Sequence, residues 1–155
     1  MISIEFPSEK GTYILILQLD VSAHLTIGKL GSFDFSAGWY AYVGSAFGPG
    51  GLRGRLKHHF SPVTKPHWHI DYLRSVAVVR EIWWIANETR YEHEWAHTLL
   101  TQQHNSFVPV QRFGASDCSC ATHLLGFFEK LDFGAFCKAT EIQLHREKTD
   151  HSAHN

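Results

Sequence analysis

A short basic stretch in the first half of the chain carries side chains suited to binding phosphate. The stretch contains Arg53, Arg55, Lys57, His58 and His59. Arg55 and His59 are four residues apart, so on a helix they lie on the same face. Clustered cations in a chain that is otherwise nearly neutral indicate a site for an anion such as phosphate. The same stretch also fits a solvated amphipathic helix that turns Leu52, Leu56 and Phe60 toward the core.

Two tyrosines stand beside glycines at the expected ends of two strands. Tyr13 follows Gly11 in Gly-Thr-Tyr, and Tyr42 precedes Gly44 in Ala-Tyr-Val-Gly. On adjacent strands with matching ends, these residues bring two phenols together, and each phenol can donate or accept one proton. Glycine at both places lets a ligand approach the backbone. The alternative is that both tyrosines only pack within the sheet.

Cysteine and histidine gather at two places that suit a metal. Cys118, Cys120 and His123 follow one another closely, and His67 and His69 come earlier in the chain. Two thiolates and one imidazole supply three of the four ligands of a tetrahedral zinc site, and His67 or His69 can supply the fourth. The sequence therefore allows a zinc site.

The same cysteines also have a purely structural interpretation. Asp117 and Cys118 can cap a helix, while His69 and Asp71 brace the basic stretch. A cysteine in a reducing compartment is often a small buried hydrophobe. Three cysteines are too few for a disulfide framework. The zinc and the structural interpretation both stay open at this point.

The composition limits the class of protein to which these residues belong. The chain has 155 residues, of which 44% are hydrophobic and 19% are charged, and its net charge is −1. These values exclude intrinsic disorder, and no apolar run is long enough to predict a membrane span. The near balance of 14 basic and 15 acidic residues also excludes a surface that is basic overall, though not a local basic patch. The first residues lack the charged-then-apolar order of a signal peptide, so we expect a cytoplasmic protein without a membrane partner.

Apolar patterns and breaker residues predict an α+β fold. Strands are predicted over residues 13–19, 25–35, 39–44 and 76–86, the second as a hairpin or bulged strand. Helices are predicted over residues 52–60, 67–74, 91–100 and 116–131, the last capped by Ser116 or Asp117. Residues 1–144 are expected to form a single domain, and residues 145–155 a flexible polar tail.

Taken in order, these motifs resemble those of the GIY-YIG nuclease superfamily. The matching motifs are Gly11-Thr12-Tyr13, Ala41-Tyr42-Val43-Gly44, Arg55-x-x-x-His59 and a later helical glutamate. Segments 39–46, 50–59, 67–73 and 114–124 resemble one small branch, a domain of unknown function that occurs alone or fused to endonuclease III-like repair proteins. The resemblance covers about residues 10 to 130. Thr12 and Val43 stand where the superfamily usually has isoleucine, and residues 20–38 form a longer insertion.

The resemblance implies a Mg²⁺- or Mn²⁺-dependent endonuclease. Its expected core is a small three-stranded mixed sheet flanked by helices, here with an added β excursion and a C-terminal helix. Tyr13 then matches the tyrosine that is a candidate general base for water, and Tyr42 matches the tyrosine of the second motif. Arg55 matches the arginine that steadies the scissile phosphate, and His59 the histidine one turn later.

A glutamate on the helix after the last core strand binds the metal in this superfamily. We match Glu92 to it, with Glu94 as the rival, because Mg²⁺ prefers carboxylate oxygen. Further substrate contacts are expected from Gly44, Ser45, Arg53, Lys57, His58 and His69. The expected partner is nucleic acid, with DNA as the first candidate. Two alternatives are a nucleic-acid-binding module without turnover and a small zinc-binding protein that uses Cys118, Cys120 and His123.

Overall fold

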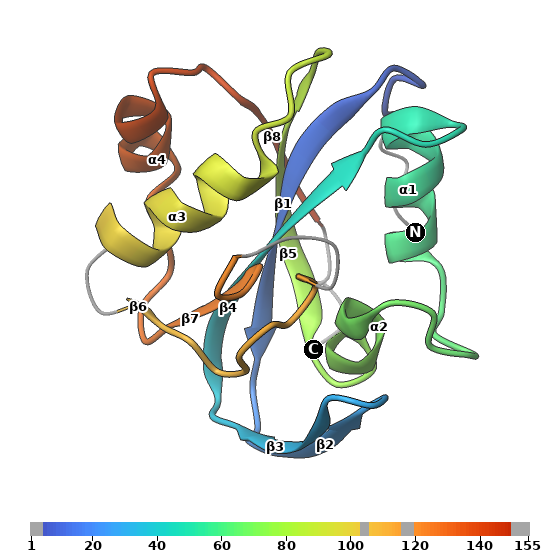
Figure 1. Ribbon diagram of the computed structural model, residues 1–155, viewed down its shortest axis with the longest axis vertical. Coiled ribbons are helices and arrows are strands. Elements are labelled where there is room, and N and C mark those ends of the chain that lie inside the picture. The colour runs from blue at the N-terminus through green and yellow to red at the C-terminus, as the bar shows by residue number, and fades with distance from the viewer. Residues whose placement is uncertain (1–4, 103–105, 116–119, 150–155) are drawn as a thin grey trace.

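A six-stranded antiparallel sheet lies at the centre of the computed structural model, which describes residues 5–102, 106–115 and 120–149 (Figure 1). The three long strands are β1 (Gly11–Leu19), β4 (Gly38–Ala46) and β5 (Val78–Ala86). The three short ones are β6 (Ser106–Phe107), β7 (Leu124–Phe127) and β8 (His145–Lys148). Their order across the sheet is β6-β7-β4-β1-β5-β8.

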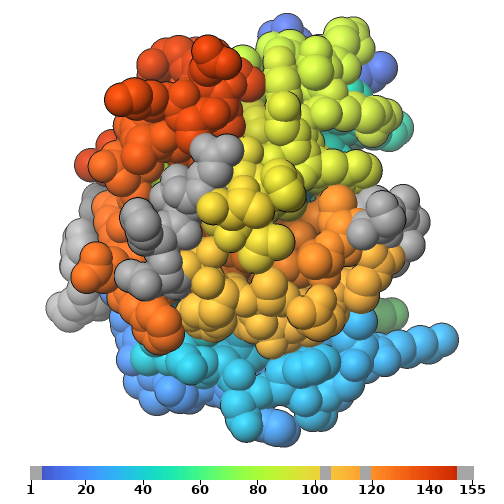
Figure 2. Space-filling view, turned by 60° about the vertical axis from the view of Figure 1, so that its left-hand side comes forward, coloured from blue at the N-terminus to red at the C-terminus, as the bar shows by residue number. Residues whose placement is uncertain are grey.

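Helices cover both faces of this sheet, which confirms the predicted α+β class. Helices α1 (Gly51–Phe60) and α2 (His69–Arg74) lie on one face, and α3 (Glu92–Gln102) and α4 (Phe133–Thr140) on the other (Figure 1). Figure 2 shows the second face, with α3 in yellow at its centre. The predicted β excursion is a separate hairpin of β2 (Ala23–Ile27) and β3 (Gly31–Phe35). None of the helices in the described ranges has the length and apolar character needed to cross a bilayer.

The central strand β1 explains why its sequence is almost continuously apolar. It pairs with β4 on one side and β5 on the other. Successive side chains of a strand point to opposite faces, so Tyr13 and Leu15 join the core under α1, while Ile14 and Ile16 join the core under α3. A strand buried on both faces has no position left for a polar face.

Helix α1 is amphipathic, as one of the two interpretations of the basic stretch requires. Leu52 and Leu56 are buried against the sheet, and His59 shares this inner face. The helix begins at Gly51, whose φ of 57° favours glycine. A Cβ atom there would also lie 2.1 Å from the carbonyl oxygen of Ser8. The turn into α1 therefore needs glycine.

The sheet differs from the small three-stranded mixed sheet that the resemblance implies. The three long strands are present, but three short strands extend the sheet at its two edges. All described strand pairs are antiparallel. The added strands come from the second half of the chain, which returns to the open edges of β4 and β5. Their pairing satisfies backbone N–H and C=O groups that an edge strand would leave without partners.

The prediction of a helix over residues 116–131 is wrong for its described part. Leu124–Phe127 form β7, in which every residue is buried, and this strand pairs with β4. A short apolar run fits a buried strand as well as a helix. Here the run forms a strand because it pairs with the open edge of β4. The C-terminal helix is instead α4, where the side chain of Asp132 accepts a hydrogen bond from the backbone N–H of Ala135. The proposed caps Ser116 and Asp117 lie outside the described residues.

The predicted flexible tail is also wrong at its beginning, because His145–Lys148 form β8 at the edge of the sheet. The buried carboxylate of Glu81 holds this strand in place. It accepts hydrogen bonds from Nε of Arg146 at 2.7 Å and from Nε1 of Trp83 at 3.0 Å. Nζ of Lys130 lies 2.6 Å from it. Residues 150–155 lie outside the described residues.

Replacing Glu81 by glutamine is expected to destabilise the fold by about 2 kcal/mol, since it removes a charged acceptor from three donors. Burial alone raises the pKa of Glu81, but hydrogen bonds from Arg146, Lys130 and Trp83 lower it from 4.5 to about 2. The stabilisation is therefore complete above pH 4.5 and is lost as the pH falls toward 2. Urea unfolding at several pH values measures both effects.

The exposed Glu129 provides the control, since Glu129→Gln removes one negative charge but no buried hydrogen-bond acceptor. This variant should follow the wild-type curve. If Glu81→Gln lost as much stability between pH 4.5 and 2 as the wild type does, the assigned role of Glu81 would be wrong.

Candidate active site

A pocket of about 510 Å³ opens at the ends of β4 and α3, beside α1 and the start of α2. Seven of the residues singled out from the sequence line it: Tyr42, Ser45, Arg55, His67, His69, Glu92 and His123. Four further lining residues were not anticipated: Trp68, Arg90, His93 and Gly114. Two of these four adjoin a candidate residue in the chain, because Trp68 stands between His67 and His69, and His93 follows Glu92. Gly114 opens the branch-motif segment 114–124.

The two tyrosines lie on adjacent antiparallel strands at matching ends, as predicted. Tyr13 is opposite Gly44, and Tyr42 is opposite Leu15, so both phenols are on the α1 side of the sheet. Tyr42 lines the pocket, whereas Tyr13 is fully buried behind it. Burial, together with the nearby phenol of Tyr13 and the carboxylate of Glu92, raises the pKa of Tyr42 well above 10.

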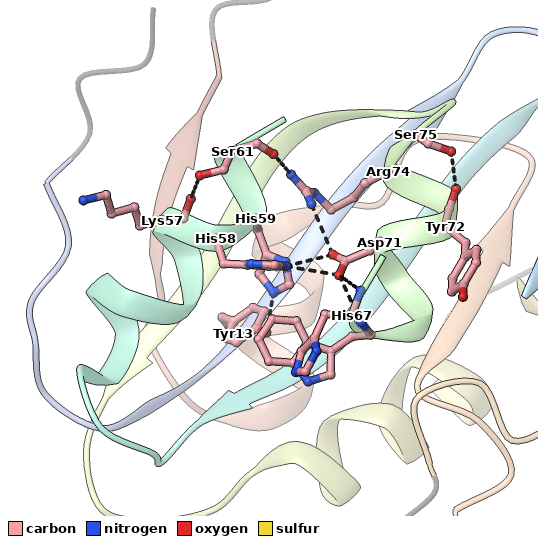
Figure 3. A network of polar contacts seen from close by, with 11 residues as sticks. Tyr13, Lys57, His58, His59, Ser61, His67, Asp71, Tyr72, Arg74 and Ser75 are labelled. Atoms are coloured by element: carbon pink, nitrogen blue, oxygen red, sulfur yellow. Dashed lines mark hydrogen bonds and ion pairs between the residues drawn. The ribbon is translucent and has the colours of Figure 1, made fainter. Parts of the chain in front are cut away.

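Tyr13 and His59 form a buried pair. The hydroxyl of Tyr13 and Nε2 of His59 are joined by a hydrogen bond of 2.7 Å (Figure 3). Burial raises the pKa of the Tyr13 phenol, and the positive charge of Arg55 opposes this shift. Burial and the neighbouring charges of Arg74 and His58 lower the pKa of His59 to about 3, so its imidazole is neutral. A buried neutral phenol on a neutral imidazole is a poor base, and this pair does not favour the role expected of Tyr13.

Gly44 supports the Tyr13 ring and does not line the pocket. A Cβ atom at Gly44 would lie 2.4 Å from both Cζ and the hydroxyl oxygen of Tyr13. The absence of a side chain at the second motif's glycine thus makes room for the first motif's tyrosine. Gly44 therefore has a packing role, and its expected contact with substrate stays a prediction.

Gly44→Ala should therefore destabilise the protein by roughly 1–3 kcal/mol, because the methyl group forces the Tyr13 ring to move. Gly48→Ala is the matched control, since no atom lies within 4 Å of a Cβ at that position. We expect the control to stay within about 0.5 kcal/mol of the wild type. Denaturant unfolding of the three proteins measures the difference, and equal stability would contradict the packing role.

Arg55 is the residue of the basic stretch that reaches the pocket. Its guanidinium lies 4.4 Å from the centre of the Trp68 ring, a distance typical of a cation–π contact. Arg90 lies in the same way over Phe47, at 4.2 Å. Both arginines line the pocket. Two guanidinium groups held on aromatic rings are thus available to an anion there.

The other basic residues named from the sequence do not line the pocket. Arg53 and Lys57 are exposed on α1, and Nε of Arg53 donates to the backbone oxygen of Phe6. Nε2 of His58 lies 3.1 Å from each carboxylate oxygen of Asp71. The structure therefore separates Arg53, Lys57 and His58 from the residues that meet at the pocket.

Asp71 organises the polar network beside the pocket (Figure 3). Its carboxylate accepts hydrogen bonds from the backbone N–H groups of His67 and Trp68 and from Nη1 of Arg74. Burial alone raises the pKa of Asp71, but these N–H groups and His58 lower it below its ordinary value. The interpretation that Asp71 braces the basic stretch is confirmed by these contacts.

His69 braces a different segment and stays in the pocket. Its Nδ1 accepts a hydrogen bond of 2.8 Å from the backbone N–H of Gly114. Burial lowers the pKa of His69, which favours the neutral ring. Because Nδ1 is the acceptor, the single ring proton of neutral His69 is on Nε2. His69 therefore offers one hydrogen-bond donor.

Glu92 brings a carboxylate to the pocket. It is the first residue of α3, and its side chain is 23% exposed. Its Oε2 atom lies 3.4 Å from Nδ1 of His123. Among the lining residues that the structure describes, Glu92 alone is acidic. The rival Glu94 is exposed on α3 and does not line the pocket.

The proposed zinc ligands are only partly brought together. Cys120 and His123 lie close to His93, which the sequence analysis missed. His67 lines the pocket but belongs to neither of the described groups of ligand atoms that could hold a metal. Cys118 lies outside the described residues.

The model of one protein family matches residues 12–144, and that family is described as Domain of unknown function DUF123. No curated protein and no solved structure matches the chain. The matched region includes every residue that lines the pocket. Because the match covers most of its length, the chain belongs to the family described as Domain of unknown function DUF123.

Proposed function

We propose that this protein hydrolyses phosphodiester bonds of nucleic acid with the help of a bound Mg²⁺ or Mn²⁺ ion, as GIY-YIG nucleases do. The observation that carries the proposal is the meeting of Arg55, Tyr42 and Glu92 in one pocket. These residues come from α1, β4 and α3, and together they offer an anion-binding group, a phenol and a metal-binding carboxylate. DNA and RNA both contain the bond in question.

Arg55 and Arg90 would bind the phosphate. A guanidinium can donate two parallel hydrogen bonds to one phosphate, and the contact of each arginine with an aromatic ring orders it before substrate binds. Nε2–H of His69 adds a neutral donor at the same pocket. This arrangement places donors where negative charge develops in the transition state.

Glu92 would hold the divalent ion. A single carboxylate is enough for Mg²⁺ when substrate phosphate and water complete its coordination. Asp71 is a weaker candidate, because its carboxylate already bonds to two backbone N–H groups, to His58 and to the cationic Arg74. A bound ion would neutralise charge on the phosphoryl oxygens and lower the pKa of a coordinated water.

Tyr42 would orient the attacking water, since its phenol lines the pocket. Tyr13 and His59 act here as positioning residues. The charge of Arg55 lowers the pKa of the Tyr13 phenol, so we infer that the Tyr13–His59 pair helps to position Arg55. In this scheme Tyr13 is not needed as a buried base, because an ion held by Glu92 would lower the pKa of the water that Tyr42 orients, and the proton of that water would pass to solvent.

Substitution of Arg55 tests whether the pocket is catalytic. We expect Arg55→Lys to keep much of the affinity for nucleic acid but to lose on the order of 100-fold in single-turnover cleavage, because lysine lacks the planar fork. Arg55→Ala should also lower the salt dependence of binding by about one phosphate contact. The assay uses single-stranded, duplex and branched DNA and RNA with Mg²⁺ or Mn²⁺. The exposed Arg53, two residues earlier, supplies the control variant Arg53→Lys.

Equal cleavage by the wild type, Arg55→Lys and Arg55→Ala would refute the role of Arg55. If the wild type bound the panel and cleaved none of it, a nucleic-acid-binding module without turnover would be the better conclusion.

A further inference from the structure

A group of soft metal ligands lies at the edge of the pocket, beside Glu92. His93 is the second residue of α3, and Cys120 and His123 lie in the segment just before β7. One ligand atom from each of the three residues lies within 4.8 Å of the other two. Residues that are far apart in the chain thus place two imidazoles and one thiol around one point.

We propose that His93, Cys120 and His123 form a zinc site. Thiolate and imidazole together select zinc over Mg²⁺, which prefers oxygen. In a tetrahedral site with metal–ligand bonds of about 2.0–2.3 Å, the ligand atoms are roughly 3.5 Å apart. The three residues can reach that spacing by small side-chain rotations, since the side chain of His93 is 63% exposed and can turn.

The surroundings of the three ligands also suit a cation. Oε2 of Glu92 lies 3.4 Å from Nδ1 of His123, and Oε1 lies 3.9 Å from Nε2 of His93. A carboxylate beside ligating imidazoles is the common partner of zinc sites, because it orients the rings and makes them more basic. His93 and His123 both line the pocket, so a fourth zinc ligand, such as water, would face it.

A second group of possible ligands, His58, His59 and Asp71, meets the same distance limit but suits a cation less well. Nε2 of His59 is already bonded to Tyr13. The cationic Arg74 lies 3.2 Å from the carboxylate of Asp71 and would repel an ion there. His58, His59 and Asp71 are therefore not proposed as a metal site.

The zinc site does not rest on the proposed hydrolysis. Zinc content tests the zinc site, and Mg²⁺- or Mn²⁺-dependent cleavage tests the proposed hydrolysis. Either proposal can therefore fail without the other. The full chain, prepared without an affinity tag, is loaded with zinc, passed through a desalting column and analysed for metal. We expect about one zinc per chain in the wild type and roughly a tenth of that or less in His93→Asn and Cys120→Ser.

Two matched controls separate the site from adventitious binding. His97→Asn changes an exposed histidine one turn further along α3, and Cys137→Ser changes a cysteine on α4. Both should keep the wild-type zinc content. His93 is exposed, so its variant should fold even if Cys120→Ser does not. A wild type without zinc, or equal zinc in His93→Asn and His97→Asn, would overturn the proposal.

Cobalt gives a direct test of the thiolate ligand. When Co²⁺ replaces zinc, we expect a thiolate-to-metal absorption band in the near ultraviolet and the intense visible bands of a tetrahedral ion. The near-ultraviolet band should persist in Cys137→Ser and disappear in Cys120→Ser. Bound Co²⁺ without this band in the wild type would show that Cys120 is not a ligand and would refute the site as proposed.

Discussion

Replacing Glu92 by glutamine should reduce Mg²⁺-dependent cleavage on the order of 100-fold or more, because an amide is a much weaker ligand than a carboxylate for this ion. The loss should appear in single-turnover rates at saturating nucleic acid. Binding of nucleic acid should change little, since Arg55 and Arg90 remain at the pocket. Raising the concentration of Mn²⁺ should restore part of the activity by compensating for weaker binding.

Glu94→Gln is the matched control for this experiment. Glu94 is in the first turn of the same helix, but it is exposed and does not line the pocket. Its variant should cleave at close to the wild-type rate. If Glu94→Gln abolished cleavage while Glu92→Gln had no effect, the metal would be assigned to the wrong carboxylate.

The two tyrosine hydroxyls should have different effects when they are removed. Tyr42→Phe should lower single-turnover cleavage roughly 100-fold, since a positioned proton-transfer or water-orienting group contributes at least this much. The stability of this variant should stay near that of the wild type, because the Tyr42 ring and its packing against Phe113 remain. Thermal unfolding and cleavage rates are measured on the same preparations.

Tyr13→Phe should mainly reduce stability. It leaves Nε2 of the buried His59 without its partner, which costs about 1–3 kcal/mol. The remaining activity should keep the wild-type pH profile, because Tyr13 does not exchange a proton with substrate in this scheme. If Tyr13→Phe instead abolished cleavage without loss of stability and Tyr42→Phe remained active, the buried phenol would be the base that the resemblance implies.

Much of the fold follows from local patterns in the sequence. The continuous apolar run of β1 predicts a strand buried on both faces, and the spacing of Leu52 and Leu56 predicts the inner face of α1. The tyrosine motifs predict two strands with matching ends, which is the register observed between Tyr13 and Gly44. Glu92 is predicted at a helix start just after a strand, and it lies there. Each of these features depends on residues close in sequence.

The features that sequence analysis missed depend on distant contacts. β7 has only four residues, so its apolar run fits a helix as well, and only its pairing with β4 decides. β8 is polar and becomes a strand because Arg146 meets Glu81 far back in the chain. The rings of His93 and His123 lie close together because the segment before β7 passes the start of α3. No local sequence pattern predicts this contact.

A crystal structure of the protein with Mn²⁺ and a short oligonucleotide with a non-hydrolysable linkage tests the central claim most directly. Anomalous scattering locates the Mn²⁺ ion without assumptions about its ligands. We expect the ion at about 2.0–2.2 Å from a carboxylate oxygen of Glu92 and a backbone phosphate within hydrogen-bond distance of the Arg55 guanidinium. Mn²⁺ bound away from Glu92, or an oligonucleotide bound outside the pocket, would contradict the proposed active site.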